Sequence, residues 1–195
     1  MTVSYASAPA LPPGTPAHTR WGWINAYGVV AIAVLSIVQL WAMSDVMLKY
    51  FREMAFLIAT ARTAPGGYPS SIATGMFAEM MPMTIAFTLI GLVSWALFAL
   101  CVVAAYRDHR DLGRLGYPRR FHWAWSFFGL FTPFGLLVYP IGRAVVVHRQ
   151  SGAGWAPMWL AIAATTVGLL VTLGGAVWLF FSMFDAIASM RAMVA

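Results

Sequence analysis

The chain has 195 residues, of which 61% are apolar and only 9% are charged. A water-soluble domain carries about 25% charged residues, and a soluble chain of this length cannot bury so much apolar surface. The composition therefore excludes an ordinary soluble domain and indicates an integral membrane protein. The net charge is +6. Because the basic residues stand beside apolar runs, we expect anionic lipid head groups as the partner and no nucleic acid.

Residues 1–20 are rich in proline and alanine and show no apolar period. Their prolines would interrupt any helix, so we expect a disordered N-terminal tail. No Lys or Arg precedes Arg20, and the apolar run that follows is too long for a signal peptide. We therefore expect both segments to be retained.

Four apolar segments are long enough to cross a bilayer, which takes about 20 helical residues. They cover residues 21–43, 80–106, 122–142 and 157–184. Tryptophan and tyrosine flank the first segment, as in an interfacial aromatic belt. The sequence predicts an all-α fold: a polytopic membrane helix bundle of about four transmembrane helices and one amphipathic helix, in a single domain over residues 21–195.

The amphipathic helix is expected at residues 45–62. Apolar residues recur there at helical spacing, and the charged residues fall mostly on the other side. The segment is either an interfacial helix or a continuation of the first span beyond the membrane.

The third apolar segment, residues 122–142, is interrupted by Pro133 and Pro140. Each proline removes a backbone donor and clashes with the preceding turn, and in lipid the freed carbonyls need other partners. The segment is either a kinked span or a re-entrant hairpin that returns to the same side of the membrane.

The distribution of Lys and Arg predicts the orientation, because short cytoplasmic loops carry the excess. Four spans with a cytoplasmic N-terminus place seven basic residues inside and five outside, whereas a re-entrant third segment gives eight inside and four outside. Both versions predict a multi-pass protein of the cell (cytoplasmic) membrane with its N-terminus in the cytoplasm.

No pattern in the sequence supplies catalytic or metal-binding chemistry. The four histidines lack ligand spacing, and Cys101 stands alone inside an apolar run. Asp108 and Asp111 alternate with arginines, so we expect mutual neutralisation along one helix. We find no nucleophile triad and no phosphate-binding glycine loop. We therefore expect no catalytic residue, no metal and no cofactor, and no enzyme activity.

Two ionisable residues close to membrane depth are candidates for a polar site, Glu79 and Arg143. Glu79 is expected to be an interfacial acid near the start of the second span. Arg143, just after Pro140, is expected to extend toward head groups, or else to satisfy carbonyls freed by the proline.

Two sets of residues indicate interaction surfaces. Small residues that permit close helix packing in lipid share one face of the last segment: Ala161, Ala164, Thr165, Gly168, Thr172, Gly175 and Ser182. They would pack against the protein's own helices, a partner or a second copy. Arginines that suit an anionic cytoplasmic leaflet follow the second span: Arg107, Arg110, Arg114, Arg119 and Arg120.

The stretch from the second span to Arg149 includes Trp123-Ala124-Trp125, Pro133, Tyr139-Pro140, Arg143 and Val145-Val146-Val147-His148-Arg149, ahead of Trp155-Ala156-Pro157. In its flanking aromatic and proline residues it resembles a class of small, uncharacterised bacterial four-helix membrane proteins. The resemblance covers under half of the chain. It implies a four-helix architecture in a bacterial cytoplasmic membrane and carries no activity with it.

The function expected from these features is that of a non-enzymatic accessory or scaffold subunit, which packs in a membrane complex with a protein partner or as a homo-oligomer. A small channel or carrier for a neutral or lipidic substrate is the first alternative, since a broken segment can line a cavity. A lipid-acting membrane enzyme is the second. It would need Glu79, His122 and Arg143 to converge at one interface.

Overall fold

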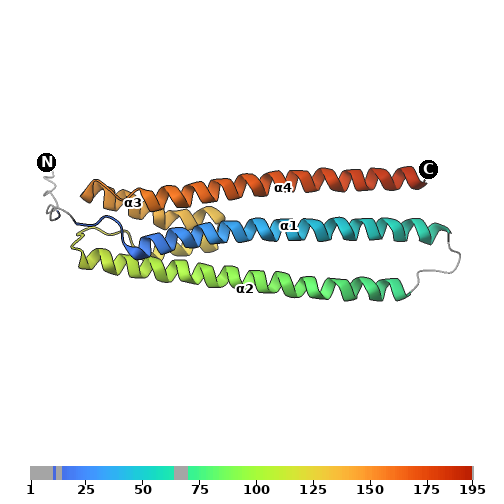
Figure 1. Cartoon of the computed structure of the whole chain (residues 1–195), viewed down its shortest axis with the longest axis horizontal. Helices are drawn as coiled ribbons and strands as arrows, with labels where there is room; N and C mark the ends of the chain where they lie inside the picture. The colour runs from blue at the N-terminus through green and yellow to red at the C-terminus, as the bar shows by residue number, and fades with distance from the viewer. Residues whose placement is uncertain (1–10, 12–14, 64–69, 195) are drawn as a thin grey trace, which may run out of the picture. The chain divides into compact units, whose positions relative to one another are not determined.

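The computed structural model describes residues 11, 15–63 and 70–194, with side chains omitted for residues 55–80, 133 and 190–194. Every regular element in this part of the chain is a helix (Figure 1). The elements are α1 (Arg20–Thr63), α2 (Ser70–Arg114), η1 (Trp123–Leu130), η2 (Pro133–Leu137), α3 (Val138–Ser151) and α4 (Ala156–Val194). The predicted all-α class is confirmed.

Three of the described helices are long and apolar enough to cross a membrane, within Arg20–Met54, Met81–Arg114 and Ala156–Ser189. This is the pattern of a multi-pass membrane protein. α1 has 44 residues and rises about 66 Å, roughly twice the hydrocarbon thickness of a bilayer. Residues 45–62 belong to this continuous helix, so the amphipathic segment extends the first span and is not a separate helix.

The segment at 122–142, expected to be a kinked span or a re-entrant hairpin, is not a continuous helix, and a fourth span is not confirmed. It forms η1, η2 and the start of α3, and these three elements pack on one another. The prolines explain the break, because each occupies a first helical turn, where a missing N–H costs little. Pro133 begins η2 after Thr132, whose side chain accepts a hydrogen bond from the N–H of Gly135 at 3.0 Å.

Together, η1, η2 and α3 form a hairpin, here called the 122–151 hairpin, whose two ends meet. At its base, the side-chain amide of Gln150 donates to the carbonyl of Arg119 at 2.8 Å. Near its tip, the two arms pack so closely that a Cβ added at Gly129 would lie 2.7 Å from Leu136 Cδ2. Gly152 then ends α3 in the left-handed conformation, with φ of 74°, which glycine adopts without steric cost.

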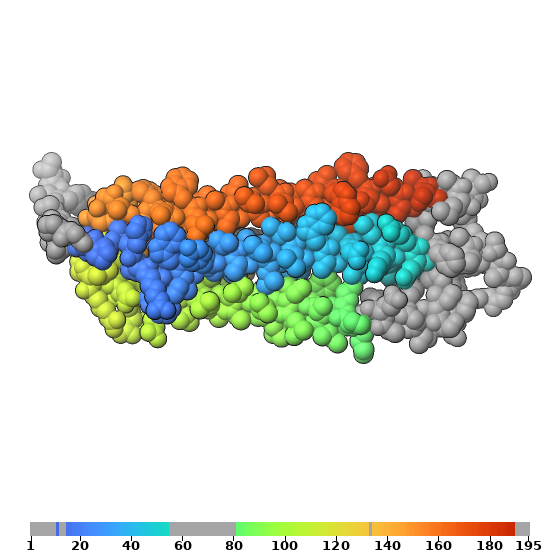
Figure 2. All heavy atoms as spheres, in the orientation of Figure 1, coloured from blue at the N-terminus to red at the C-terminus, as the bar shows by residue number. Residues whose placement is uncertain are grey.

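The chain divides into two compact units, each made of segments far apart in sequence. Unit 1 comprises Met1–Ala33 and Trp95–Val167, and unit 2 comprises Val34–Ser94 and Gly168–Ala195. Within unit 1, the first turns of α1 lie between the end of α2 and the start of α4 (Figure 2). Within unit 2, the rings of Trp41 and Trp178 lie 5.6 Å apart, joining α1 to α4.

Residues 15–19, which the sequence places in a disordered tail, are packed within unit 1. Ala17 and Thr19 are each only 7% exposed. Ala17 contacts a buried apolar cluster with Leu112, Tyr117 and Val147, and the Tyr117 hydroxyl donates to the carbonyl of Pro16 at 3.3 Å. These contacts, rather than helix propensity, hold the segment in place. Residues 1–10 and 12–14 of the predicted tail lie outside the described part of the chain.

Candidate functional site: a buried polar network

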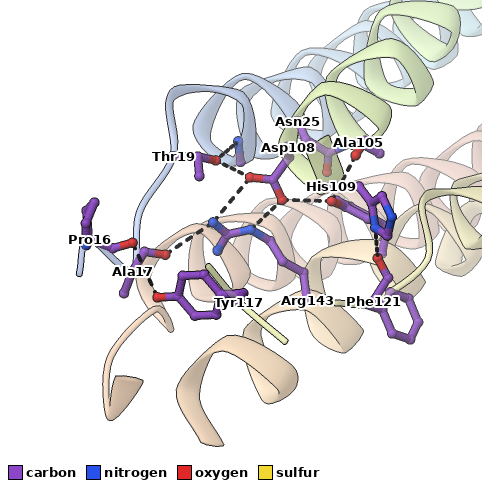
Figure 3. A network of polar contacts seen from close by, with 12 residues as sticks. Pro16, Ala17, Thr19, Asn25, Ala105, Asp108, His109, Tyr117, Phe121 and Arg143 are labelled. Atoms are coloured by element: carbon purple, nitrogen blue, oxygen red, sulfur yellow. Dashed lines mark hydrogen bonds and ion pairs between the residues drawn. The ribbon is translucent and has the colours of Figure 1, made fainter. Parts of the chain in front are cut away.

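An aspartate at the end of α2 forms the centre of a buried polar network in unit 1 (Figure 3). Asp108 is fully buried. Its Oδ2 atom accepts a hydrogen bond from Arg143 Nε at 2.7 Å, and its Oδ1 atom accepts one from Arg143 Nη2 at 3.3 Å. The pair is therefore bidentate, the geometry in which Arg binds a carboxylate most strongly. The Thr19 hydroxyl also donates to Oδ1.

The guanidinium of Arg143 also reaches the segment before α1. Its Nη2 atom donates to the carbonyl of Ala17 at 3.2 Å. Gly22 makes room for it, because a Cβ at that position would lie 3.0 Å from the guanidinium carbon. The third nitrogen, Nη1, is buried and has no hydrogen-bond partner among the described residues. The pairing of this cation therefore depends on Asp108.

Tyr139, one turn before Arg143 in α3, completes the network. Its hydroxyl lies 2.7 Å from Asp108 Oδ2 and 3.0 Å from the carbonyl oxygen of Ala105, so one proton is shared between two acceptors. The phenol therefore acts as the donor in both contacts.

A second polar contact, deeper in unit 1, joins α1 to α2. The buried Asn25 side chain donates to the carbonyl of Cys101 at 2.8 Å. Gly28, one turn further along α1, leaves the space that the Cys101 thiol fills, and a Cβ there would overlap the sulfur. The Cys101 thiol in turn donates to the carbonyl of Asn25 at 3.9 Å. Small residues and these two interhelical hydrogen bonds thus set the α1–α2 distance, as is common in lipid-embedded packing.

This arrangement is suited to holding three segments together rather than to chemistry. Asp108 receives donors from the pre-α1 segment and from two residues of α3, and its charge is matched by one arginine inside the same network. A carboxylate so fully satisfied is neither a free base nor a free metal ligand. Nor do the described residues include a group of three or more His, Cys, Asp or Glu side chains placed to hold a metal ion.

The structure corrects two predictions about these residues. Arg143 is 2% exposed and does not extend to head groups, because its partner Asp108 lies inside the protein. The carbonyl it contacts belongs to Ala17, not to the turn freed by Pro140. Asp108 does not pair with its helical neighbours, whereas Asp111 does, at 3.3 Å from Arg114.

No other predicted residue with a described side chain has a hydrogen bond to Asp108, Arg143 or Tyr139. The five arginines after the second span, Arg107, Arg110, Arg114, Arg119 and Arg120, are all exposed. Of the seven small residues in α4, Ala161, Gly168 and Gly175 are buried, and Ala164, Thr165, Thr172 and Ser182 are half-buried. That face is thus largely covered by the protein itself. Glu79 has its side chain outside the described part of the chain.

Sequence reasoning missed Thr19, Asp108 and Tyr139 as members of one network, and it missed Asn25 as the donor of the second contact. A signal for Asp108 was present. Cys101, Ala104, Ala105, Asp108 and Leu112 follow helical spacing, and all five are buried. The aspartate therefore belongs to the small-residue face of α2, not to the arginine face. Its partner in α3 has no comparable signal, because the hairpin that presents Arg143 is not readable from periodicity.

Comparison with protein-family models, with curated proteins and with solved structures gives no match for this chain.

Proposed function

We propose that this chain is a non-enzymatic accessory or scaffold subunit of a membrane complex, built from three spans and one re-entrant hairpin. The observation that carries the proposal is the buried Asp108–Arg143 pair. In the described part of unit 1, the buried charged residues Asp108 and Arg143 pair with each other and stabilise the fold. What unit 1 and unit 2 offer outward is apolar helix surface for lipid or protein, and exposed arginines.

The depth of the 122–151 hairpin supports a re-entrant topology. Gly129, near its tip, packs so closely against α2 that a Cβ added there would lie 2.9 Å from the Phe98 ring. Phe98 precedes Arg107, the first charged residue after the apolar run of α2, by about two and a half turns, or roughly 14 Å. That is about half the hydrocarbon thickness, so the hairpin reaches mid-membrane and returns.

This topology strengthens the charge asymmetry. With three spans, eight basic residues belong to the side of the N-terminus: Arg20, Arg107, Arg110, Arg114, Arg119, Arg120, Arg143 and Arg149. The other side receives Lys49, Arg52, Arg62 and Arg191. The positive-inside rule then places the N-terminus in the cytoplasm of a cell whose cytoplasmic membrane holds the protein, with the C-terminus outside.

The two alternative functions receive less support. A channel or carrier would need space beside Thr132 and Gly135, but a Cβ at Gly135 would overlap the carbonyl of Phe128, so the backbone is closely packed there. A lipid-acting enzyme would need His122 and Arg143 available. Arg143 is paired with Asp108, and His122 accepts a hydrogen bond from the N–H of Ala124 at 3.2 Å, as the N-cap of η1.

The test is purification from the native membrane in mild detergent, followed by mass spectrometry of co-purifying proteins. An accessory subunit recovers a partner in stoichiometric amount, or a defined homo-oligomer. A lone monomer that catalyses flux in liposomes would contradict the proposal and support the carrier.

A further inference from the structure

The exposed face of α2 in unit 1 changes from apolar to cationic within one turn. Trp95, Leu100 and Val103 are 63%, 43% and 48% exposed, and after them Arg107 and Arg110 are exposed. On a helix in lipid, such a change marks the level at which acyl chains give way to head groups.

The charge of these two arginines is not balanced inside unit 1. The sequence of unit 1 contains only two carboxylate side chains, Asp108 and Asp111. Asp108 is paired with Arg143, and Asp111 with Arg114. Arg107 and Arg110 instead lie over aromatic rings, at 5.6 Å from the Trp21 ring centre and 5.9 Å from that of Tyr106. A guanidinium that stacks on an aromatic ring still has its in-plane N–H groups available to donate to an anion such as phosphate.

The same surface continues as an aromatic row toward the membrane interior. Tyr106 contacts Trp123 of η1 edge-on, with ring centres 5.5 Å apart, and Trp123 contacts Phe127 at 5.9 Å. Phe127 is 40% exposed. The surface therefore begins with arginines, continues with the amphipathic rings of Tyr106 and Trp123, and ends with the apolar ring of Phe127. A phospholipid has its phosphate, glycerol and acyl regions in the same order.

We infer that this arginine–aromatic face, formed by Trp21, Tyr106, Arg107, Arg110, Trp123 and Phe127, is a binding site for one anionic phospholipid. Arg107 and Arg110 hold the head-group phosphate, and the row from Tyr106 to Phe127 supports the glycerol and an acyl chain. The inference does not depend on the proposed function, since a lipid can occupy this face in an accessory subunit, a carrier or an enzyme.

The test is native mass spectrometry of the full chain released from nanodiscs that contain equal amounts of phosphatidylglycerol and phosphatidylcholine. The wild type is expected to retain phosphatidylglycerol preferentially, by about tenfold, because both lipids carry the phosphate but the choline cation of phosphatidylcholine opposes binding to two arginines. The double variant Arg107→Gln/Arg110→Gln is expected to lose this preference. The control Lys49→Gln/Arg52→Gln removes the same charge from exposed positions of α1 in unit 2 and is expected to keep it.

Three results would overturn the inference. One is the absence of a phosphatidylglycerol preference in the wild type, and another is an equal loss in both double variants, which would indicate general electrostatic attraction. The third is displacement of the lipid by excess inorganic phosphate, which would indicate an anion site without acyl recognition. Trp123→Ala keeps both arginines and is expected to lower retention severalfold. Unchanged retention would exclude the aromatic row from the site.

Discussion

Arg143 of α3 forms an ion pair with Asp108 of α2, with an Nε–Oδ2 distance of 2.7 Å, and their side chains are 3% and 0% exposed. Thirty-five residues separate them in sequence. The carboxylate also receives the Thr19 hydroxyl from the segment before α1, and the guanidinium donates to Ala17 in the same segment. One ion pair therefore fixes the entry of α1, the end of α2 and the returning arm of the hairpin.

The hydroxyl of Tyr139 is expected to contribute to this network as a donor to a charged acceptor. Tyr139→Phe keeps the ring and removes the donor, so the free energy of unfolding is expected to fall by about 1.5–3 kcal/mol. The matched control is Tyr117→Phe, whose hydroxyl donates to the neutral carbonyl of Pro16 at 3.3 Å and is expected to cost about 0.5–1.5 kcal/mol. Thermal unfolding in detergent compares the two. A larger loss in the control would contradict the charged role of Tyr139.

The contact of Gly28 with Cys101 makes a specific steric prediction. Gly28→Ala would bring a methyl group into overlap with the Cys101 sulfur, and overpacking of this kind costs about 1–3 kcal/mol. Adding Cys101→Ala is expected to restore most of the loss, since the Cys101 Cβ lies 4.0 Å from the new methyl position. The control is Gly91→Ala in α2, where nothing lies within 4 Å. Equal effects at the two glycines, or no rescue, would refute the contact.

The small-residue face of α4 offers a pair of adjacent glycines for a direct comparison. Gly175 is buried, and a Cβ there would lie 2.7 Å from Leu40 of α1, whereas Gly174 has open space around it. Gly175→Leu is expected to destabilise the monomer by about 1–3 kcal/mol, while Gly174→Leu leaves its melting temperature nearly unchanged. If Gly175→Leu instead left monomer stability intact and reduced complex size, this part of the face would belong to a partner.

The proposed re-entrant topology predicts which positions share a side of the membrane. Cys101 is the only cysteine, so Cys101→Ala gives a background for single-cysteine labelling. A re-entrant hairpin places Arg119→Cys and Ala153→Cys on one side and Ser189→Cys on the other. Four spans would place residues 119 and 189 together and residue 153 opposite. Labelling of sealed vesicles with a membrane-impermeant maleimide distinguishes these patterns, and the second would contradict the hairpin.

The long apolar helices could be predicted because each depends on a run of consecutive apolar residues, which is visible in the sequence without knowledge of tertiary contacts. Residues 21–43, 80–106 and 157–184 all fall within helices of the structure. The hairpin was only one of two alternatives, since Pro133 and Pro140 indicate a break without specifying which way the chain turns. Its direction depends on close contacts such as Gly129 with Phe98 and Gln150 with Arg119, which join residues distant in sequence.

The polar network was predicted least well, for a related reason. In sequence, Asp108 has arginines on both sides, and local pairing is the simplest expectation. Its helical position among Cys101, Ala104, Ala105 and Leu112 points instead to the packed side of α2. Arg143 can be identified as the partner of Asp108 only from the tertiary fold. A buried carboxylate needs a buried cation that pairs with it in bidentate geometry, and only the fold shows that both residues are buried.

The most direct test of the account is a double-mutant cycle on the buried pair, measured by reversible unfolding and by recovery of the co-purifying complex. Asp108→Leu and Arg143→Met, each alone, leave an uncompensated buried charge and are expected to cost about 3–5 kcal/mol. The double variant is expected to recover most of that stability and the full complex, because in the proposed function the pair serves only to hold the fold. Additive losses would contradict the pairing, and a stable double variant that no longer assembles or functions would contradict its purely structural role.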